Sequence, residues 1–510
     1  MPFHTRCELA VPQGRAAAPE SQTGHHPGSE DAAASNRRRD GAPGDAPGVS
    51  AAGTVVALGV ETLCRRDGER TAGGGRRPSR REVHVKRILR TATLVLLALP
   101  LAPRALDGEV TVYGTLMPFA DNARVSGATE ASPSDGATQV PGSAYTGVDV
   151  PQRFRLGSGT SHLGFKGGLD LLGEDLQVFF QVESTVSVDA ADSPNSWASR
   201  NTGVGLKGKF GRVLLGNWDT PYKYPTPFVG PIRGLNSFDN ALVGTPGFGV
   251  PATTTQSGRA GKAADAAFNR RQGNSVQYWS PELHGFSARL AVSLNESKTV
   301  PPASPSVSPT LYSGVVSYVR GPLTVRYAYE RHQDYFGLSQ LGGSAAATTA
   351  NDSSTDQGHL VVVQAALPTG TRLSGMAERL SYENADDTPG VVNAYARYAF
   401  YALAQQRFGS HQLWASYGLA LRGTCEVAGG GACTTRGLGA SQLGAGYSYA
   451  IGKSFDLYAA YYQLANDRSA SYAVVGGPGA VAPGGTTRGL GLGFLYTFSA
   501  TATAGAPKGI

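Results

Sequence analysis

The sequence predicts an all-β protein that spans a membrane as a closed, antiparallel β-barrel of about sixteen strands. Between residues 109 and 498, about sixteen segments alternate apolar and polar residues, and turn-forming residues separate them. The segments run about 9–12 residues, the length of a tilted strand that crosses a bilayer. Tyr and Phe collect near segment ends, as in the aromatic girdles of membrane barrels.

The two faces of these segments differ in polarity. One face is apolar, whereas the other carries Arg, Glu, Gln and Gly, which suits a water-filled lumen better than a dry core. A soluble β-sandwich also alternates and is the competing interpretation. Backbone groups in lipid must all be paired, so spanning strands have to close into a ring. The clearest segments are 176–183, 323–330, 412–422, 442–449 and 489–498.

The composition narrows the class of protein further. The chain has 510 residues, of which only 16% are charged, with 68 Gly and 22 Tyr. Charge this low argues against a disordered polyampholyte. The longest apolar runs fall short of about 18 residues, which argues against a helical membrane protein.

The basic character of the chain belongs mostly to its N-terminal part. Residues 1–105 hold 16 basic and 10 acidic residues, so the rest is close to neutral. Only Phe3 of the 44 aromatic residues precedes residue 106, and such a segment cannot build much of a core. We therefore expect residues 1–84 to be disordered, or to be an extension outside the natural product. A nucleic-acid partner is not expected.

Residues 85–108 have the pattern of a signal peptide. Lys86, Arg87 and Arg90 precede the apolar stretch 91–102, which is too short to span as a helix, and small residues follow it. Cleavage is expected within 102–108, and translation is expected to start near Val85. A buried core helix over 91–102 is the alternative.

The connections between segments fall into two kinds. Short turns are predicted at 208–211, 321–322 and 408–410. One rim of short turns and one rim of long loops is typical of outer-membrane barrels, and a barrel of this strand number leaves an aqueous channel. Long loops are predicted at about 187–199, 219–269, 295–309, 331–357, 383–393, 423–438 and 466–486.

Several segments resemble the general diffusion porins of the Gram-negative outer membrane, most closely the betaproteobacterial type. The resemblance implies a sixteen-stranded antiparallel transmembrane β-barrel, usually a homotrimer, whose third long loop folds inward as a constriction loop. The segments that carry it are VTVYGT (110–115), SHLGFKG (161–167), LQVFFQVES (176–184), VGLKGKFG (204–211), VLLG (213–216), NSVQYWSP (274–281) and GF (285–286).

The resemblance also implies a charged constriction, in which basic wall residues face acids on the inward loop and create a transverse field. The basic wall positions fall on His162, Arg200 and Arg271, with Arg270 beside the last. His162 stands where the family commonly has arginine. Because histidine has an unperturbed pKa of about 6.5, the wall is expected to be less basic than is common. Ordinary lumen or rim charges are the alternative interpretation.

The inward loop would be 219–269, with Asp219 and Asp239 as the candidate acids. Asp265 is the third acid of this segment, which also holds four basic residues, and the acidic motif usual in the family is not clearly present. We expect weak ion selectivity, with anions the possible preference.

Two further features concern assembly. Cys425 and Cys433 flank a Gly-rich stretch and are expected to form an intraloop disulfide; a metal site is the alternative, but nearby His or further Cys ligands are lacking. The resemblance identifies Phe494, Tyr496 and Phe498 as the C-terminal assembly signal, which leaves 499–510 as a tail.

Motifs of enzymes are not found, including the Walker A loop, the dinucleotide fingerprint, HExxH and CxxC. We expect no catalytic residues, no cofactor and no metal. The sequence favours a pore for passive diffusion of small hydrophilic solutes and ions, with outer-membrane lipid and lipopolysaccharide as surroundings. A substrate-specific channel and a barrel that works mainly as an adhesin or surface scaffold are the alternatives.

Overall fold

A computed structural model describes the barrel and most of its loops. The described residues are 108–128, 138–139, 149–172, 175–189, 197–228, 240–248, 266–294, 308–340, 353–385, 388–474, 477–479 and 481–504. The predicted extension (1–84) and the predicted signal peptide lie outside them, apart from Gly108, the last residue of the latter, which already begins the first strand.

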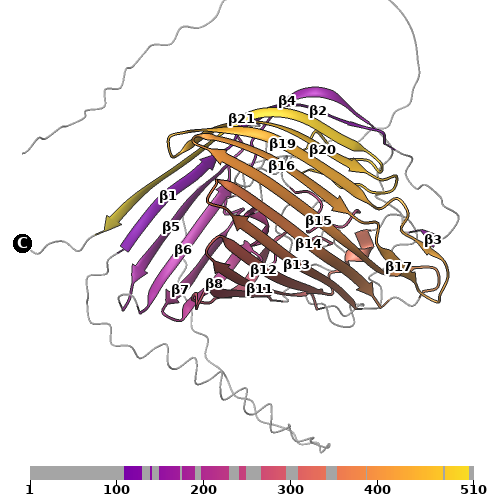
Figure 1. The fold of residues 1–510 in the computed structure, drawn as a ribbon. Coiled ribbons are helices and arrows are strands. Elements are labelled where there is room, and N and C mark those ends of the chain that lie inside the picture. Colours follow the sequence, from indigo (N-terminus) through magenta and orange to yellow (C-terminus); the bar gives the residue numbers. More distant parts are fainter. Residues whose placement is uncertain are drawn as a thin grey trace, which may run out of the picture. The chain divides into compact units, whose positions relative to one another are not determined.

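Sixteen strands pair with their neighbours in an antiparallel ring, which confirms the predicted fold class (Figure 1). The first strand of the ring consists of the two segments β1 and β2, and the second consists of β4 and β5. β1 pairs with β5, and β2 pairs with β4. β21 closes the ring by pairing with β20 on one side and with β1 and β2 on the other. The strands are β1 (Gly108–Leu116) with β2 (Phe119–Ser126), β4 (Val150–Gly157) with β5 (His162–Asp170), β6 (Gln177–Thr185), β7 (Thr202–Gly208), β8 (Gly211–Asp219), β9 (Arg271–Trp279), β10 (Phe286–Ser293), β11 (Thr310–Arg320), β12 (Leu323–Gln333), β13 (Ser354–Ala366), β14 (Thr371–Asn384), β15 (Val392–Phe408), β16 (His411–Ala420), β19 (Ala440–Ile451), β20 (Phe455–Asn466) and β21 (Thr486–Ala504).

The remaining elements are small. β17 (Thr424–Val427) continues the line of β16 and pairs with the first part of β15. β3 (Thr138–Gln139) and β18 (Cys433–Thr434) form a two-residue parallel bridge. Two 3₁₀ helices, η1 (Thr226–Phe228) and η2 (Gly337–Gln340), lie in loops. Among the described residues, no helix is both long and apolar enough to cross a membrane.

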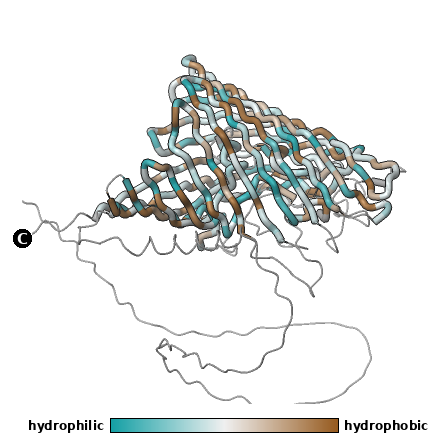
Figure 2. The backbone as a smooth tube through the Cα atoms, turned by 90° about the horizontal axis from the view of Figure 1, so that it is seen from below, coloured by the Kyte–Doolittle hydropathy of each residue, from teal (hydrophilic) through white to brown (hydrophobic). Residues whose placement is uncertain are grey.

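Hydrophobic and hydrophilic residues alternate along the strands (Figure 2), and apolar side chains lie on the outer face, as predicted. On β21, Leu490 and Leu492 are 62% and 65% exposed on the outer face, where lipid would cover them. On β12, Leu323 and Tyr327 face outward, whereas Arg326 and Glu330 are buried on the inner face. Because successive strand residues point to opposite faces, one register fixes both surfaces.

The two rims differ as the sequence predicts. Short connections at 209–210, 321–322 and 409–410 lie at one end, and Gly321 and Gly409 adopt left-handed φ angles of 56° and 59° there. The long connections lie at the other end. The sequence interpretation omitted one of them, the connection 127–149 between β2 and β4. It is rich in small and polar residues, which gave no periodic pattern to set it apart.

The C-terminal strand is longer than predicted. β21 continues to Ala504, so the boundary expected after Phe498 is wrong. Ala504 pairs with Gly108, and the whole of β1 uses the segment Tyr496–Ala504 as its partner. The first strand begins early, and its backbone groups require this extra length of β21. Residues 505–510 lie outside the described residues.

Candidate functional site

The described parts of the long connection between β8 and β9 lie inside the barrel against one wall, as predicted for the inward loop. These parts are 220–228, 240–248 and 266–270. The Tyr222 amide donates to Ser313 Oγ on β11 at 3.0 Å, and the Ala241 amide donates to Gln442 Oε1 on β19 at 2.8 Å. We call these three parts the seated loop.

A buried ion pair on the wall holds the seated loop in place. Arg397 Nη2 lies 3.1 Å from Glu378 Oε2, and both side chains are fully buried. Glu378 Oε1 accepts a hydrogen bond from the Tyr222 hydroxyl at 2.6 Å and one from the Gly244 amide at 2.8 Å. Arg397 donates to the carbonyl of Leu242 at 2.8 Å. The pair thus joins the two charges to each other and to the loop.

Aromatic side chains complete this contact. The Phe268 ring stacks on His332 of β12 at 4.3 Å between centroids and lies 5.5 Å from the Tyr222 ring. Phe248 meets Tyr395 of β15 at 5.4 Å. Gly358 of β13 permits the approach, because a Cβ there would lie 2.8 Å from Phe268 and 3.0 Å from Tyr222. The inner face of β12–β15 therefore combines aromatic contacts with buried charged side chains.

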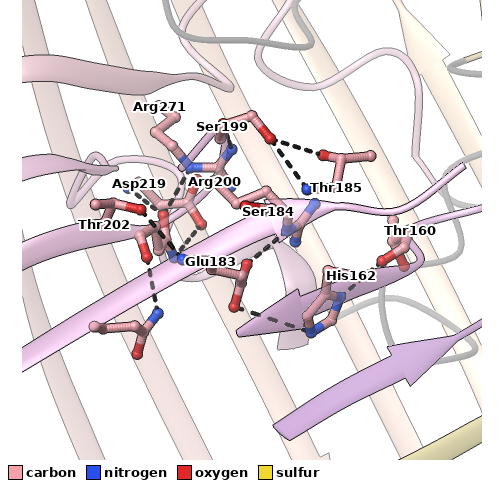
Figure 3. Close-up of polar contacts among 12 residues, drawn as sticks. Thr160, His162, Glu183, Ser184, Thr185, Ser199, Arg200, Thr202, Asp219 and Arg271 are labelled. Carbon is pink, nitrogen blue, oxygen red and sulfur yellow. Dashed lines mark hydrogen bonds and ion pairs between the residues drawn. The ribbon is translucent and has the colours of Figure 1, made fainter. Parts of the chain in front are cut away.

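The other side of the ring carries a row of charged residues on or beside β5 to β9, some of them partly exposed (Figure 3). Arg200 Nε lies 2.5 Å from Glu183 Oε1, and His162 Nε2 lies 3.9 Å from Glu183 Oε2. The Tyr113 hydroxyl donates to the same carboxylate at 2.9 Å. The Arg200 and His162 side chains are 23% and 18% exposed, so they remain in contact with the lumen.

The row continues around Asp219. Its Oδ1 lies 3.1 Å from Arg271 Nη2 and 3.1 Å from Lys223 Nζ. Asn201 bridges the group, accepting from Arg271 Nε at 2.7 Å and donating to Asp219 Oδ2 at 3.1 Å. Burial lowers the pKa of the Lys223 amino group, and the neighbouring Asp219 carboxylate opposes that shift. We call His162, Glu183, Arg200, Asp219, Lys223 and Arg271 the charged row.

Three of the four expected basic positions come together in this row: His162, Arg200 and Arg271. Arg270 lies apart from them: it is buried, with its guanidinium 5.0 Å from the centre of the Tyr335 ring. Asp219 is the last residue of β8 and pairs in register with Arg271, so it belongs to the wall and not to the loop that faces it. Asp239 lies outside the described residues.

The acid that sequence reasoning missed is Glu183. It stands on the polar face of its segment, but the family pattern directs attention to acids on the loop. In the described parts of the seated loop there is no Asp or Glu, and its charged residues there are Lys223 and Arg270. The arginines are consequently neutralised by carboxylates of their own wall.

The cysteines and the residues of the predicted assembly signal occupy the expected elements. Cys425 and Cys433 form a disulfide with a Cα–Cα distance of 5.9 Å, in the loop that contains β17 and β18. Phe494 and Tyr496 are exposed on the outer face of β21, and Tyr496 stacks on Phe498 at 5.8 Å.

A closed sixteen-stranded ring with an apolar outer face, an inward loop and a charged inner wall defines an outer-membrane β-barrel of the pore-forming class. The pattern of the Gram-negative porin family matches residues 92–469. The chain belongs to the Gram-negative porin family, and its location is therefore the outer membrane.

Relatives of known name agree with this placement. The chain is 30% identical over 244 residues to the major outer membrane protein P.IB of Neisseria meningitidis serogroup A, covering 48% of this chain and 60% of that protein. It is 28% identical over 351 residues to the P.IA protein of the same serogroup, covering 62% of this chain and 80% of the relative. The anion-selective porin from Comamonas acidovorans has a similar fold, with a TM-score of 0.54 and 19% identity over 77% of this chain and 100% of that one.

Proposed function

We propose that this protein is a water-filled channel for the passive diffusion of small hydrophilic solutes and ions across the outer membrane, and that it is not an enzyme. The observation that carries the proposal is the charged row, which stays partly exposed on the inner face while the seated loop covers the far side of the ring. Fixed charges beside a narrow passage orient polar solutes and bias the flow of ions.

Planar-bilayer recordings of the purified protein test this proposal. Stable stepwise currents in KCl, together with swelling of proteoliposomes in small sugars, are expected. Protein that inserts into the bilayer and carries no current would contradict a diffusion channel. Swelling with one solute class alone would indicate a substrate-specific channel instead.

We propose in addition a weak preference for anions. The charged row holds three basic side chains, Arg200, Lys223 and Arg271, against the two carboxylates of Glu183 and Asp219. The excess of positive charge lies on the exposed side of the lumen and would favour anions by a potential of about one kT or more. A reversal potential in a KCl gradient that strongly favours potassium would refute this preference.

Family membership and the resemblance support two further proposals: assembly as a homotrimer, and export through a signal peptide within 85–108. Light scattering in detergent should give three times the mass of one chain, and currents should appear in groups of three steps. Mass spectrometry of protein from isolated outer membranes should show that the mature chain begins within 102–108. A stable monomer would contradict the trimer, and native peptides from residues 1–84 would contradict the export proposal.

A further inference from the structure

A second cluster of basic residues lies nearer the short-turn rim and is separate from the charged row. Lys207 on β7 pairs in register with Arg212 on β8, which pairs with Trp279 on β9, which pairs with Arg289 on β10. Their strand neighbours Val213 and Leu290 are exposed on the outer face, so these four side chains belong to the inner face. The four residues form one continuous belt across the inner wall.

Aromatic rings hold the arginines of this belt. The Arg289 guanidinium carbon lies 3.4 Å from the centre of the Tyr224 ring, in the seated loop, and 4.3 Å from that of Trp279. Arg212 lies 5.8 Å from the Trp279 ring. Arg326 of β12 approaches Tyr224 at 5.6 Å. Stacking uses the flat faces of a guanidinium and leaves its N–H edge available to bind an anion.

The belt differs from the charged row in its lack of counter-charges. Within the described ranges, no carboxylate lies at ion-pair distance from Lys207, Arg212 or Arg289. Lys207 and Arg212 stand directly opposite each other, and like charges in that position destabilise a sheet. A structural role alone would favour a carboxylate between them, as Glu183 and Asp219 provide in the charged row.

A cavity of about 560 Å³ opens onto the belt. Lys207, Arg212, Tyr224, Trp279 and Arg289 line it, together with one acid, Glu282 of the short turn after β9. Glu282 forms no ion pair with the belt in the part of the chain that the structure describes. This volume is within the range of small-ligand sites.

We propose that this cavity is a binding site for a small oxyanion that carries two negative charges, with inorganic phosphate as the probe. The inference rests on the proposed channel function and adds a saturable site to it. Three cations converge on the cavity, and the arginine fork matches the oxygens of a phosphate or carboxylate group through paired hydrogen bonds. Chloride lacks this geometry and should pass with less delay.

Single-channel recordings in constant KCl with increasing phosphate at pH 8 test this binding site. Calorimetric titration of the detergent-solubilised protein with phosphate measures the binding independently of the current. The wild-type protein should show a saturable reduction of the chloride current and a matching heat of binding. R212Q and R289Q should each raise the half-blocking concentration by about tenfold or more, because each removes a charge-assisted hydrogen-bond donor. R289K keeps the charge and loses the planar fork, so an intermediate value is expected.

R372Q is the matched control. Arg372 also lies near the short-turn rim, at the start of β14, and removing it takes one positive charge from another part of the wall. It should leave the half-blocking concentration within about twofold of wild type. The phosphate site would be refuted if phosphate gave no saturable block of the chloride current and no heat of binding. It would also be refuted if R372Q raised the half-blocking concentration as much as R212Q and R289Q do. Either result would leave the channel proposal intact. A heat of phosphate binding in a protein that carries no current would instead refute the proposed channel function.

Discussion

The two sides of the barrel interior use charge differently. Under the seated loop, Glu378 and Arg397 are fully buried, pair with each other and hydrogen-bond to the loop. On the other side, the side chains of Arg200 and His162 are about one fifth exposed, at 23% and 18%. A buried pair is costly to break, whereas a partly exposed pair is weakly coupled and can respond to ions in the lumen. The side under the seated loop therefore fixes the shape of the lumen, and the side with the charged row interacts with the ions and polar solutes that enter it.

The largest effect should come from removing one half of the buried pair. E378Q leaves Arg397 without its counter-charge and weakens the hydrogen bonds from Tyr222 and Gly244. A loss of about 3–5 kcal/mol is expected for an uncompensated buried charge. The seated loop should detach, so the single-channel conductance should rise while the unfolding temperature of the barrel falls.

E383Q is the control for this experiment, since Glu383 lies on the same strand and is exposed. It should change neither conductance nor stability measurably. If E378Q conducts as the wild-type protein does, the buried pair does not hold the loop and the contrast between the two sides fails.

The second-largest effect is expected on ion selectivity, from the charged row on the partly exposed side. E183Q removes the carboxylate that pairs with Arg200 and lies beside His162. The permeability ratio of chloride to potassium should rise roughly two- to threefold, as a change of about one kT in lumen potential implies. R200Q should lower the ratio, and the E183Q/R200Q double variant should return it towards wild type. Reversal potentials in a KCl gradient measure all three, and an unchanged ratio in both single variants would show that the row does not face the ion path.

Lys223 links the two sides, because it belongs to the seated loop and pairs with Asp219 of the charged row. Burial lowers the pKa of its amino group below the ordinary value of 10.5. As pH rises through that lowered pKa, the lysine loses its charge, the lumen becomes less positive, and anion preference should decline before pH 10.5. K223Q should show the lower preference already at neutral pH and lack this titration. A wild-type ratio that stays constant to pH 10.5 would contradict the assignment.

The sequence predicts the fold because two-residue periodicity fixes both surfaces of a strand at once. The alternation around Leu490 and Arg326 was sufficient to assign outer and inner faces. It could not predict the buried pair, because Glu378 and Arg397 come from two strands that only the register brings together, and the loop that covers them has no periodic pattern. Glu183 was visible as a polar residue on a strand, but its pairing with Arg200 depends on where the next loop returns to the wall.

The smallest effect on the current is expected from the disulfide. Cys425 and Cys433 close a short loop whose neighbour Leu438 packs in the same apolar cluster as the seated loop. C425S/C433S should loosen that loop by on the order of 2 kcal/mol of lost chain restriction. Limited proteolysis within 428–439 should become faster. Conductance should stay unchanged, because the Glu378–Arg397 pair still holds the seated loop. An altered conductance would mean that the disulfide loop shares in positioning the seated loop, and the buried side would then extend beyond the Glu378–Arg397 pair.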